Sequence, residues 1–598
     1  MSADLARLAA GTLLVSEGAP EPVAFAAAEL RAYLARMFGR APALRRVASA
    51  DPAWLRLAPG PAPLPERAPT VPAGVEWTVR PVDDAVVVAG DSPRALLAGA
   101  YALLEAAGCR WSPDGPSGER VPGPGEARRD VTAREARPAF ARRSYAADLA
   151  TWHYTVPERL AARLPSDVAF VDWMAKRGAT GFLFIRHAND TQWLIPELVP
   201  ELRRRGLEVE GGGHALVELL PRALFAEHPE YFPLGPGGGR SDLGNMCTAS
   251  APALAVVSER AATALAALPG ARDLHLWGLD LLGGGWCACG DCAALSPADQ
   301  SLRACNAVAD ALGGGRRVFH LAYHDTLAPP RGVRPHPRVW AEFAPRERCY
   351  GHALDDPACA TNTAYRRALE EHLTLFEGRV DVFEYYGDAI LFGGCAVPLV
   401  EVVARDLAYY ARAGVRGVSC LVFGRYSLWA YGANVEAFAR GGLVPADAAA
   451  GRGAHAARSG AAAEAMARYL AALERTMAGV VTRGDVLLPD AGSAGALAAA
   501  YGEAPALRRL LAAAPVPPTG EAHLLEYTLA VLEALGRWLA ATDMEAREGA
   551  LAALTDAVRH VRAVDPGLVG TWGAHDLEIT LHFFAGALRA RPLAEPVR

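Results

Sequence analysis

The sequence predicts an α/β protein built around a (β/α)8 TIM-type barrel, with a small α/β domain before it and a helical domain after it. Roughly eight short apolar runs with β character recur over about 300 residues, most of them followed by a helical pattern, as in such a barrel. Helical and strand patterns alternate before this region, and Ala-rich helical periodicity follows it. These three observations define the predicted fold class.

Composition narrows the class of protein further. The chain has 598 residues, of which 52% are hydrophobic and 21% are charged, so it can bury large cores and is not a disordered chain. A formal net charge of -6 provides no positive field for a nucleic-acid backbone. The first residues lack a basic region followed by an apolar core, and no long apolar run suggests a membrane span. We expect a soluble cytoplasmic protein that binds neither nucleic acid nor membranes.

The predicted first domain spans residues 1–130. An amphipathic helix, PVAFAAAELRAYLARMFG, is followed by alternating strands in VEWTVRPVDDAVVVAG and by a second helix, SPRALLAGAYALLEAAG. The next stretch, SPDGPSGERVPGPGEARRDV, is rich in Pro, Gly and charge, as is typical of a linker on the surface. The pattern therefore places a domain boundary near residue 135.

The predicted barrel spans residues 138–442. Its apolar runs are RRSYAADL, GFLFIRH, LEVEGGGH, DLHLWGLD, RVFHLAYH, RVWAEFAP, VDVFEYY and GVSCLVFG. The segment DTLAPPRGVRPHP, between the fifth and sixth runs, is too short and too rich in Pro to hold a helix. We therefore expect one barrel helix to be missing.

Residues 443–598 form the predicted helical domain. The segments AAAEAMARYLAALERTMAGVV, HLLEYTLAVLEALGRWLAAT and ALAALTDAVRHVRAV each carry an apolar stripe opposite Arg or Glu. Such stripes favour packing onto the barrel, and homo-oligomerisation is left open.

Several of these segments together resemble a known family. They are AAAELRAYLARMFG, SPRALLAGAYALLEAAGCRWSPDG, HPEYFPL with NMCTAS, LDLLGGGWCACGDC, NAVADAL, LAYHDTLAPP, RCYGHALDDPACATN and EYY. In this combination the chain resembles the DUF4838 proteins, which pair a barrel with an N-terminal domain like that of α-glucuronidases and family 20 hexosaminidases. The resemblance implies a carbohydrate-active enzyme, a glycoside hydrolase, and leaves the sugar undefined.

Carboxylates at strand ends provide candidate catalytic groups. Hydrolysis of a glycosidic bond needs a protonated acid and a second carboxylate that acts as nucleophile or base. Asp280 ends the fourth run and would be buried against Trp277 or Trp286, which would raise its pKa, so we predict it as the acid. Glu384 in the seventh run is the predicted partner, and Glu342 in the sixth run is the alternative.

Other polar and aromatic residues at the strand ends are predicted to bind the sugar, by hydrogen bonds to hydroxyls, by stacking on pyranose faces, or by gripping an acidic group. These residues are His187, His214, Trp286, His324, Tyr385, Tyr386, Arg425 and Trp429.

A cysteine cluster follows the fourth run. The motif WCACGDC places Cys287, Cys289 and Cys292 in one tight loop, a spacing typical of zinc ligands. Cys305, Cys247 or a histidine could supply the fourth ligand of a closed structural zinc site that fixes the loop carrying Asp280. Unliganded buried thiols, or disulfides in an exported protein, are the alternatives.

The remaining cysteines give weaker signals. Cys349 and Cys359 flank His352 and could form a second metal site or a disulfide. Three single cysteines among apolar or small residues are predicted to pack in the core, namely Cys109, Cys395 and Cys420.

No motif indicates an organic cofactor. The glycine-rich runs lack both the P-loop pattern and the dinucleotide G-x-G-x-x-G, and no GxSxG or HExxH motif occurs. We therefore expect a glycoside hydrolase that removes units from the end of a small oligosaccharide or glycoside with two carboxylates. The alternatives are a zinc-dependent hydrolase and a non-catalytic carbohydrate-binding protein.

Overall fold

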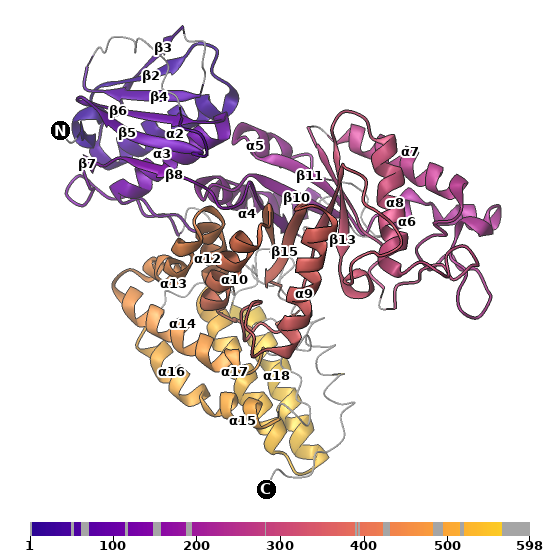
Figure 1. Ribbon diagram of the computed structural model, residues 1–598. Helices are drawn as coiled ribbons and strands as arrows, with labels where there is room; N and C mark the ends of the chain where they lie inside the picture. The colour runs from indigo at the N-terminus through magenta and orange to yellow at the C-terminus, as the bar shows by residue number, and fades with distance from the viewer. Residues whose placement is uncertain are drawn as a thin grey trace.

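The computed structural model has a central barrel between an N-terminal lobe and a C-terminal lobe (Figure 1). It describes residues 3–564 and residue 586, except for the segments given next. These segments are 49–52, 61–70, 114–117, 148–156, 187–193, 269, 282, 389–390, 393–394, 423–430, 482–493 and 515–519.

The N-terminal lobe is a six-stranded sheet in the order β3-β2-β4-β6-β5-β8. Its strands are β2 (Thr12–Ser16), β3 (Ala43–Val47), β4 (Trp54–Ala58), β5 (Trp77–Val82), β6 (Ala85–Gly90) and β8 (Arg134–Ala136). A small pair, β1 (Ala3–Asp4) with β7 (Asp130–Val131), and three helices complete it: α1 (Leu5–Ala9), α2 (Glu21–Phe38) and α3 (Pro93–Ala107). Because β8 pairs with β5, the sheet uses residues that follow the expected linker.

The central lobe is a closed barrel of eight parallel strands in the order β10-β11-β12-β13-β14-β15-β16-β9. The strands are β9 (Arg142–Ala147), β10 (Gly181–Arg186), β11 (Glu208–Gly213), β12 (Asp273–Leu276), β13 (Arg317–Ala322), β14 (Val339–Phe343), β15 (Val380–Gly387) and β16 (Gly417–Val422). Each strand coincides with one of the eight apolar runs, so the predicted (β/α)8 barrel is confirmed.

Helices surround the barrel. They are α4 (Pro157–Lys176), α5 (Val199–Arg204), α6 (Leu216–Leu219), α7 (Ala251–Ala267), α8 (Pro297–Ala311), α9 (Ala360–Leu375), α10 (Val400–Ala413) and α12 (Gly432–Leu443). Between β13 and β14 there is only a 3-10 turn, His324–Thr326, and the rest of this fully described connection is Pro-rich loop. The expected absence of one barrel helix is therefore observed.

The C-terminal lobe is helical, as predicted. Its α-helices are α13 (Gly451–Ala456), α14 (Ala463–Ala478), α15 (Ala494–Gly502), α16 (Ala504–Ala512), α17 (Gly520–Ala540) and α18 (Met544–Val564). It contacts the barrel loops directly: the backbone N–H of Ala396 donates to Thr528 Oγ1 over 2.8 Å. Among the described residues, no helix is both long and apolar enough to cross a membrane.

The only lysine of the chain joins the N-terminal lobe to the barrel. Lys176 lies at the end of α4, and its Nζ is 5.4 Å from the ring centroid of Tyr33 and 5.5 Å from those of Tyr101 and Trp111. It also forms an ion pair with Asp172. Three aromatic faces around a buried ammonium group provide a cation–π contact that a compact charge fits better than a planar guanidinium.

We therefore expect Lys176→Arg to lower the free energy of unfolding by about 1–2 kcal/mol, because the larger guanidinium cannot occupy the same space between the rings. Urea unfolding would measure the change. The matched control is Arg468→Lys on α14, whose side chain is 59% exposed and which should change stability by less than about 0.5 kcal/mol. Equal stability of Lys176→Arg and wild type would contradict this role.

Candidate functional site

Two carboxylates flank a histidine at the C-terminal end of the barrel. Asp280 follows β12, His324 follows β13, and Glu347 follows β14. The Nε2 atom of His324 lies 3.9 Å from Asp280 Oδ1, and its Nδ1 atom lies 3.3 Å from Glu347 Oε1. The side chain of Asp280 is 55% exposed, so its predicted burial against Trp277 or Trp286 is wrong. The side chain of Glu347 is 31% exposed.

These contacts limit the distance between the two carboxylates. With about 2 Å across the imidazole ring, the two oxygens that face His324 lie at most about 9 Å apart, within the separations that glycosidases use. The backbone of His324 has φ of 50°, a left-handed conformation that is costly for a residue other than glycine and is common at functional sites.

Aromatic side chains form the floor beneath these groups. The rings of Tyr323 and Tyr385 stack at 6.3 Å, and the His214 ring meets Trp277 edge-on at 5.1 Å. Burial raises the pKa of Tyr323 well above its ordinary value, so the phenol keeps its proton. These side chains therefore combine apolar aromatic rings with the hydroxyl groups of Tyr323 and Tyr385 and the imidazole of His214.

An arginine lies at the same end of the barrel. The Nε atom of Arg346 donates to Asp388 Oδ2 over 2.9 Å, and its guanidinium lies 5.9 Å from the Tyr385 ring centroid. Although burial lowers the pKa of Arg346, Asp388 raises it overall, so the side chain is a permanent cation. Asp388 also accepts from the backbone N–H of Leu391 and is buried, which makes it a positioning group for Arg346.

Glu342 lies deeper in the barrel, below the mouth. Its Oε2 accepts from Trp277 Nε1 over 3.0 Å and faces His275 Nδ1 at 2.8 Å. The other nitrogen of His275 faces Glu210, which pairs with Arg142. Burial lowers the pKa of His275, but Glu342 and Glu210 raise it to about 9, so this core is a charged network that holds Trp277.

Glu384 does not reach the mouth. On β15, Asp381 contacts Arg142 in the barrel interior, whereas Glu384 has the opposite parity and accepts a hydrogen bond from Tyr410 on α10. It also lies 3.4 Å from Arg348 and is fully buried between the barrel wall and the helix layer. The structure therefore does not bring Glu384 and Asp280 together as the expected catalytic pair.

This buried acid should make stability depend on pH. Burial and Asp406 raise the pKa of Glu384 to about 7, although Arg348 lowers it. The folded state therefore holds the proton more tightly, and the stabilisation present below pH ~4.5 is lost as pH rises through 7. We expect wild type to lose about 1–3 kcal/mol relative to Glu384→Gln between pH 5 and 8. Urea unfolding at both pH values checks this, and parallel curves would contradict it.

The predicted sugar-binding residues fall into three groups. His214, Trp286 and His324 line one small cavity of about 20 Å³ together with Tyr323. Tyr385 faces the barrel interior, but Tyr386 points outward and donates to Asp406 over 2.9 Å. His187, Arg425 and Trp429 lie outside the described residues.

Four residues of this site were not among the expected ones: Tyr323, Arg346, Glu347 and Asp388. The sequence signal was present for two of them, since Tyr323 directly follows β13 and Asp388 directly follows β15. Arg346 and Glu347 belong to APRERC, whose mixed charges suggest an ordinary surface turn.

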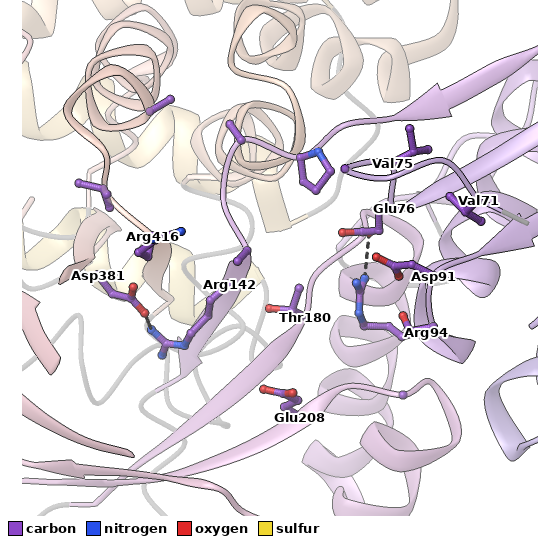
Figure 2. Close-up of a pocket in the computed structure, with 18 of the residues that line it drawn as sticks. Val71, Val75, Glu76, Asp91, Arg94, Arg142, Thr180, Glu208, Asp381 and Arg416 are labelled. Carbon is purple, nitrogen blue, oxygen red and sulfur yellow. Dashed lines mark hydrogen bonds and ion pairs between the residues drawn. The ribbon is translucent and has the colours of Figure 1, made fainter. Parts of the chain in front are cut away.

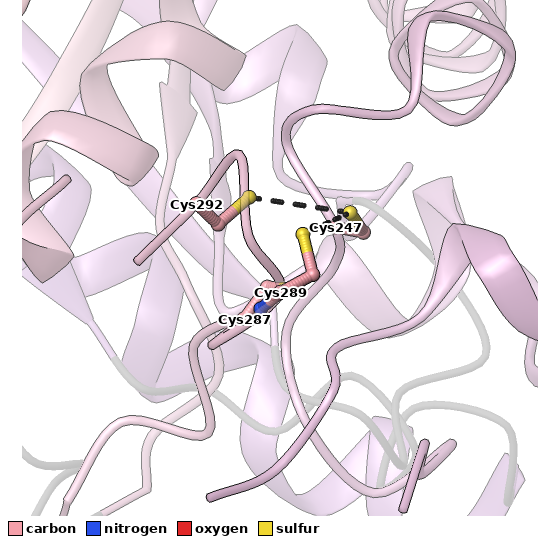
Figure 3. A group of neighbouring side chains, drawn as sticks. All are labelled: Cys247, Cys287, Cys289 and Cys292. Atoms are coloured by element: carbon pink, nitrogen blue, oxygen red, sulfur yellow. Dashed lines mark hydrogen bonds between the residues drawn. The ribbon is translucent and has the colours of Figure 1, made fainter. Parts of the chain in front are cut away.

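Four cysteines form a compact group beside the site (Figure 3). Cys247, in the segment before α7, joins Cys287, Cys289 and Cys292, and the four sulfur atoms lie within 4.8 Å of one another. Cys247 Sγ is 3.7 Å from Cys289 Sγ and 4.0 Å from Cys292 Sγ. Four thiolates around zinc, at about 2.3 Å each, have sulfur atoms about 3.8 Å apart, so this donor set fits the ion.

The predicted fourth ligand Cys305 is not part of this group. It lies on α8, and its thiol is directed to the carbonyl oxygen of Leu276 at 3.8 Å. Cys247, the alternative, takes the fourth place. Two residues before it, the Asn245 side chain accepts from the backbone N–H of Leu279 over 2.7 Å, so the cysteine group anchors the segment that leads to Asp280.

A large cavity lies at the opposite end of the barrel (Figure 2). It measures about 1490 Å³ and lies between the N-terminal lobe and the start of the strands. Its lining includes two ion pairs, Arg142 with Asp381 at 3.0 Å and Arg94 with Glu76 at 3.1 Å. Because barrel enzymes use the C-terminal strand ends, we assign no catalytic role to this cavity.

Comparison with known families identifies the barrel region. Residues 149–421 match the model of DUF4838, a domain of unknown function. The matched segment lies in the barrel region and is less than half of the chain. The match confirms the resemblance that the sequence motifs indicated, and it extends from before β10 into β16. No curated protein sequence is significantly similar to the chain.

Solved structures share the fold of this protein. A family GH115 4-O-methyl-α-glucuronidase with specificity for decorated arabinogalactans aligns with a TM-score of 0.61 and 12% identity, over 98% of this chain and 80% of that one. A family 89 glycoside hydrolase from Clostridium perfringens, in complex with GlcNAc-α-1,4-galactose, aligns with a TM-score of 0.50 and 12% identity, over 86% of this chain and 66% of that one. At these identities the likeness shows the fold alone.

Proposed function

We propose that this protein is a glycoside hydrolase that uses Asp280 and Glu347 at the barrel mouth. The observation that carries the proposal is the placement of both carboxylates on either side of His324, within about 9 Å of each other and open to solvent. The neighbours named as glycoside hydrolases support the same reaction class.

The two carboxylates take different roles. Asp280 donates its proton to the leaving oxygen, as the sequence suggested, and Glu347 acts as the nucleophile or as the base for water. His324 lies between them and orients both. Asp388 is the weaker candidate for the second role, because its two oxygens are already occupied by Arg346 and by the backbone N–H of Leu391.

The rim suits the binding of a terminal sugar unit. Tyr323 and Trp286 offer faces for stacking, and His214 and Arg346 offer polar groups for hydroxyls or an acidic substituent. We propose exo-acting hydrolysis of a small oligosaccharide or glycoside. The four-cysteine group holds a structural zinc ion, which when bound would fix the segment that carries Asp280.

A screen of aryl glycosides that includes uronides and N-acetylhexosaminides tests the proposal. We expect phenol release by wild type and its loss in Glu347→Gln. Asp280→Asn should lose activity on glycosides with a poor leaving group and much less on those with an acidic phenol. Glu384→Gln, whose carboxylate faces the helix layer, should keep wild-type rates. A protein that binds sugars without releasing product would instead be a carbohydrate-binding module. Equal activity of all four proteins would exclude both proposed catalytic residues.

A further inference from the structure

A second group of soft metal donors lies in the loop after β14, separate from the four-cysteine group. The sequence from Cys349 to Cys359 has the pattern Cys-x2-His-x6-Cys. One donor atom from each of Cys349, His352 and Cys359 lies within 4.8 Å of the others. Cys349 Sγ is 3.1 Å from His352 Nδ1, both cysteines are buried, and His352 is the most exposed of the three.

The surrounding structure holds these three side chains in place. Asn362 of α9 is fully buried and accepts from the backbone N–H of Cys349 over 2.9 Å. Its amide group donates to the carbonyl oxygens of Cys349, His352 and Ala353 at 2.9–3.0 Å. One buried amide therefore fixes the loop that carries two of the donors, so little ordering is needed when an ion binds.

The third donor and the far side of the loop are also fixed. Cys359 is the N-cap residue of α9, a helix of 16 residues, so the start of that helix fixes its position. The backbone N–H groups of Tyr350 and Gly351 both donate to the carbonyl oxygen of Val481 in the C-terminal lobe, over 2.8 and 3.1 Å. The donor group thus sits where the barrel loop meets that lobe.

We propose that Cys349, His352 and Cys359 bind a zinc ion, with water in the fourth position. Two thiolates and one imidazole are a donor set that zinc prefers over magnesium or calcium, which take oxygen ligands. The ion would close the loop that begins with Arg346 and Glu347. A Cys349–Cys359 disulfide is the competing reading, but it would leave the imidazole that faces Cys349 without a role.

Metal analysis of the full-length protein tests this proposal. We expect His352→Gln and Cys359→Ser each to lose one equivalent of zinc per chain relative to wild type, measured by mass spectrometry after dialysis against metal-free buffer. The matched control Cys305→Ser removes a buried thiol outside both groups and should keep the wild-type content. Because His352 is more exposed than the two cysteines, His352→Gln is the variant least expected to disturb folding.

Cobalt provides a second readout that does not depend on activity. Co²⁺ added to metal-free wild type should give thiolate-to-cobalt absorption. In Cys359→Ser and in His352→Gln, this absorption should fall by the part that Cys349 and Cys359 contribute in wild type. Unchanged zinc content and unchanged cobalt spectra in both variants would overturn the proposal. So would a Cys349–Cys359 disulfide found by alkylation and peptide mapping of protein prepared without reductant.

Discussion

Replacing Asp280 with Asn should lower the turnover of a glycoside with a poor leaving group by about 10²-fold or more, the usual contribution of general acid catalysis. The amide keeps the shape of the side chain and its place beside His324, but it cannot donate the proton that the leaving oxygen needs. Substrate affinity should barely change, because no contact is removed. Steady-state kinetics with an alkyl or disaccharide substrate would measure the fall.

Substrates with different leaving groups distinguish a general acid from a residue with another catalytic role. An aryl glycoside with an acidic phenol needs little protonation, so Asp280→Asn should cost much less in the cleavage of that bond. A variant equally impaired on both substrates would point to a nucleophile or a positioning group. A variant with full turnover on both would remove Asp280 from the mechanism.

The second carboxylate gives the matched comparison. Glu347→Gln should be impaired on both kinds of substrate, because a nucleophile or base is needed whatever the leaving group. Asp388→Asn weakens the hold on Arg346 and should act more on KM than on kcat. If Asp388→Asn instead abolishes turnover while Glu347→Gln does not, Asp388 replaces Glu347 as the second carboxylate.

Much of the barrel could be predicted because its signals are local. Each strand lies within a short run of apolar character between turn signals, and the Pro-rich connection after β13 shows where a helix is missing. Asp280 and the three clustered cysteines also stand out within single segments. These are features that neighbouring residues define without help from the rest of the fold.

Which residues of β15 face the barrel interior, and which face the surrounding helices, could not be predicted in this way. Parallel barrel strands are buried on both faces, so their residues are apolar throughout and do not alternate between polar and apolar. In VDVFEYY, Asp381 and Glu384 both interrupt the apolar run, and only the neighbouring strand and α10 show that Asp381 faces the interior and Glu384 the helices. The sequence pattern alone is equally consistent with the reverse.

Contacts between distant segments also could not be predicted from the sequence. Cys305 lies only 13 residues after Cys292, yet on α8 its thiol is directed toward Leu276. Cys247 lies 40 residues before Cys287, yet the segment before α7 places it beside the cysteine loop. Glu347 likewise gains its place only because β13 and β14 are neighbours, which brings it to His324. Spacing cannot report such pairings.

Removal of the zinc ion that we propose for the four-cysteine group is expected both to lower the thermal stability of the protein and to reduce its turnover. Metal-ligand bonds form only in the folded state, so their loss should cost about 3 kcal/mol or more of the free energy of unfolding. Turnover should fall as well, because Asn245, two residues from Cys247, holds the backbone next to Asp280. Calorimetry and rate assays before and after chelation would measure both effects.

Point variants separate this site from the other donor group. Cys247→Ser removes one ligand of the four-cysteine group and should reproduce the loss of stability without a chelator, whereas Cys305→Ser should respond to chelation as wild type does. A zinc ion with a catalytic role would behave differently: chelation would abolish turnover while the melting temperature stayed the same. Four reactive thiols in a native protein free of metal, with unchanged stability, would show that these cysteines only pack against one another.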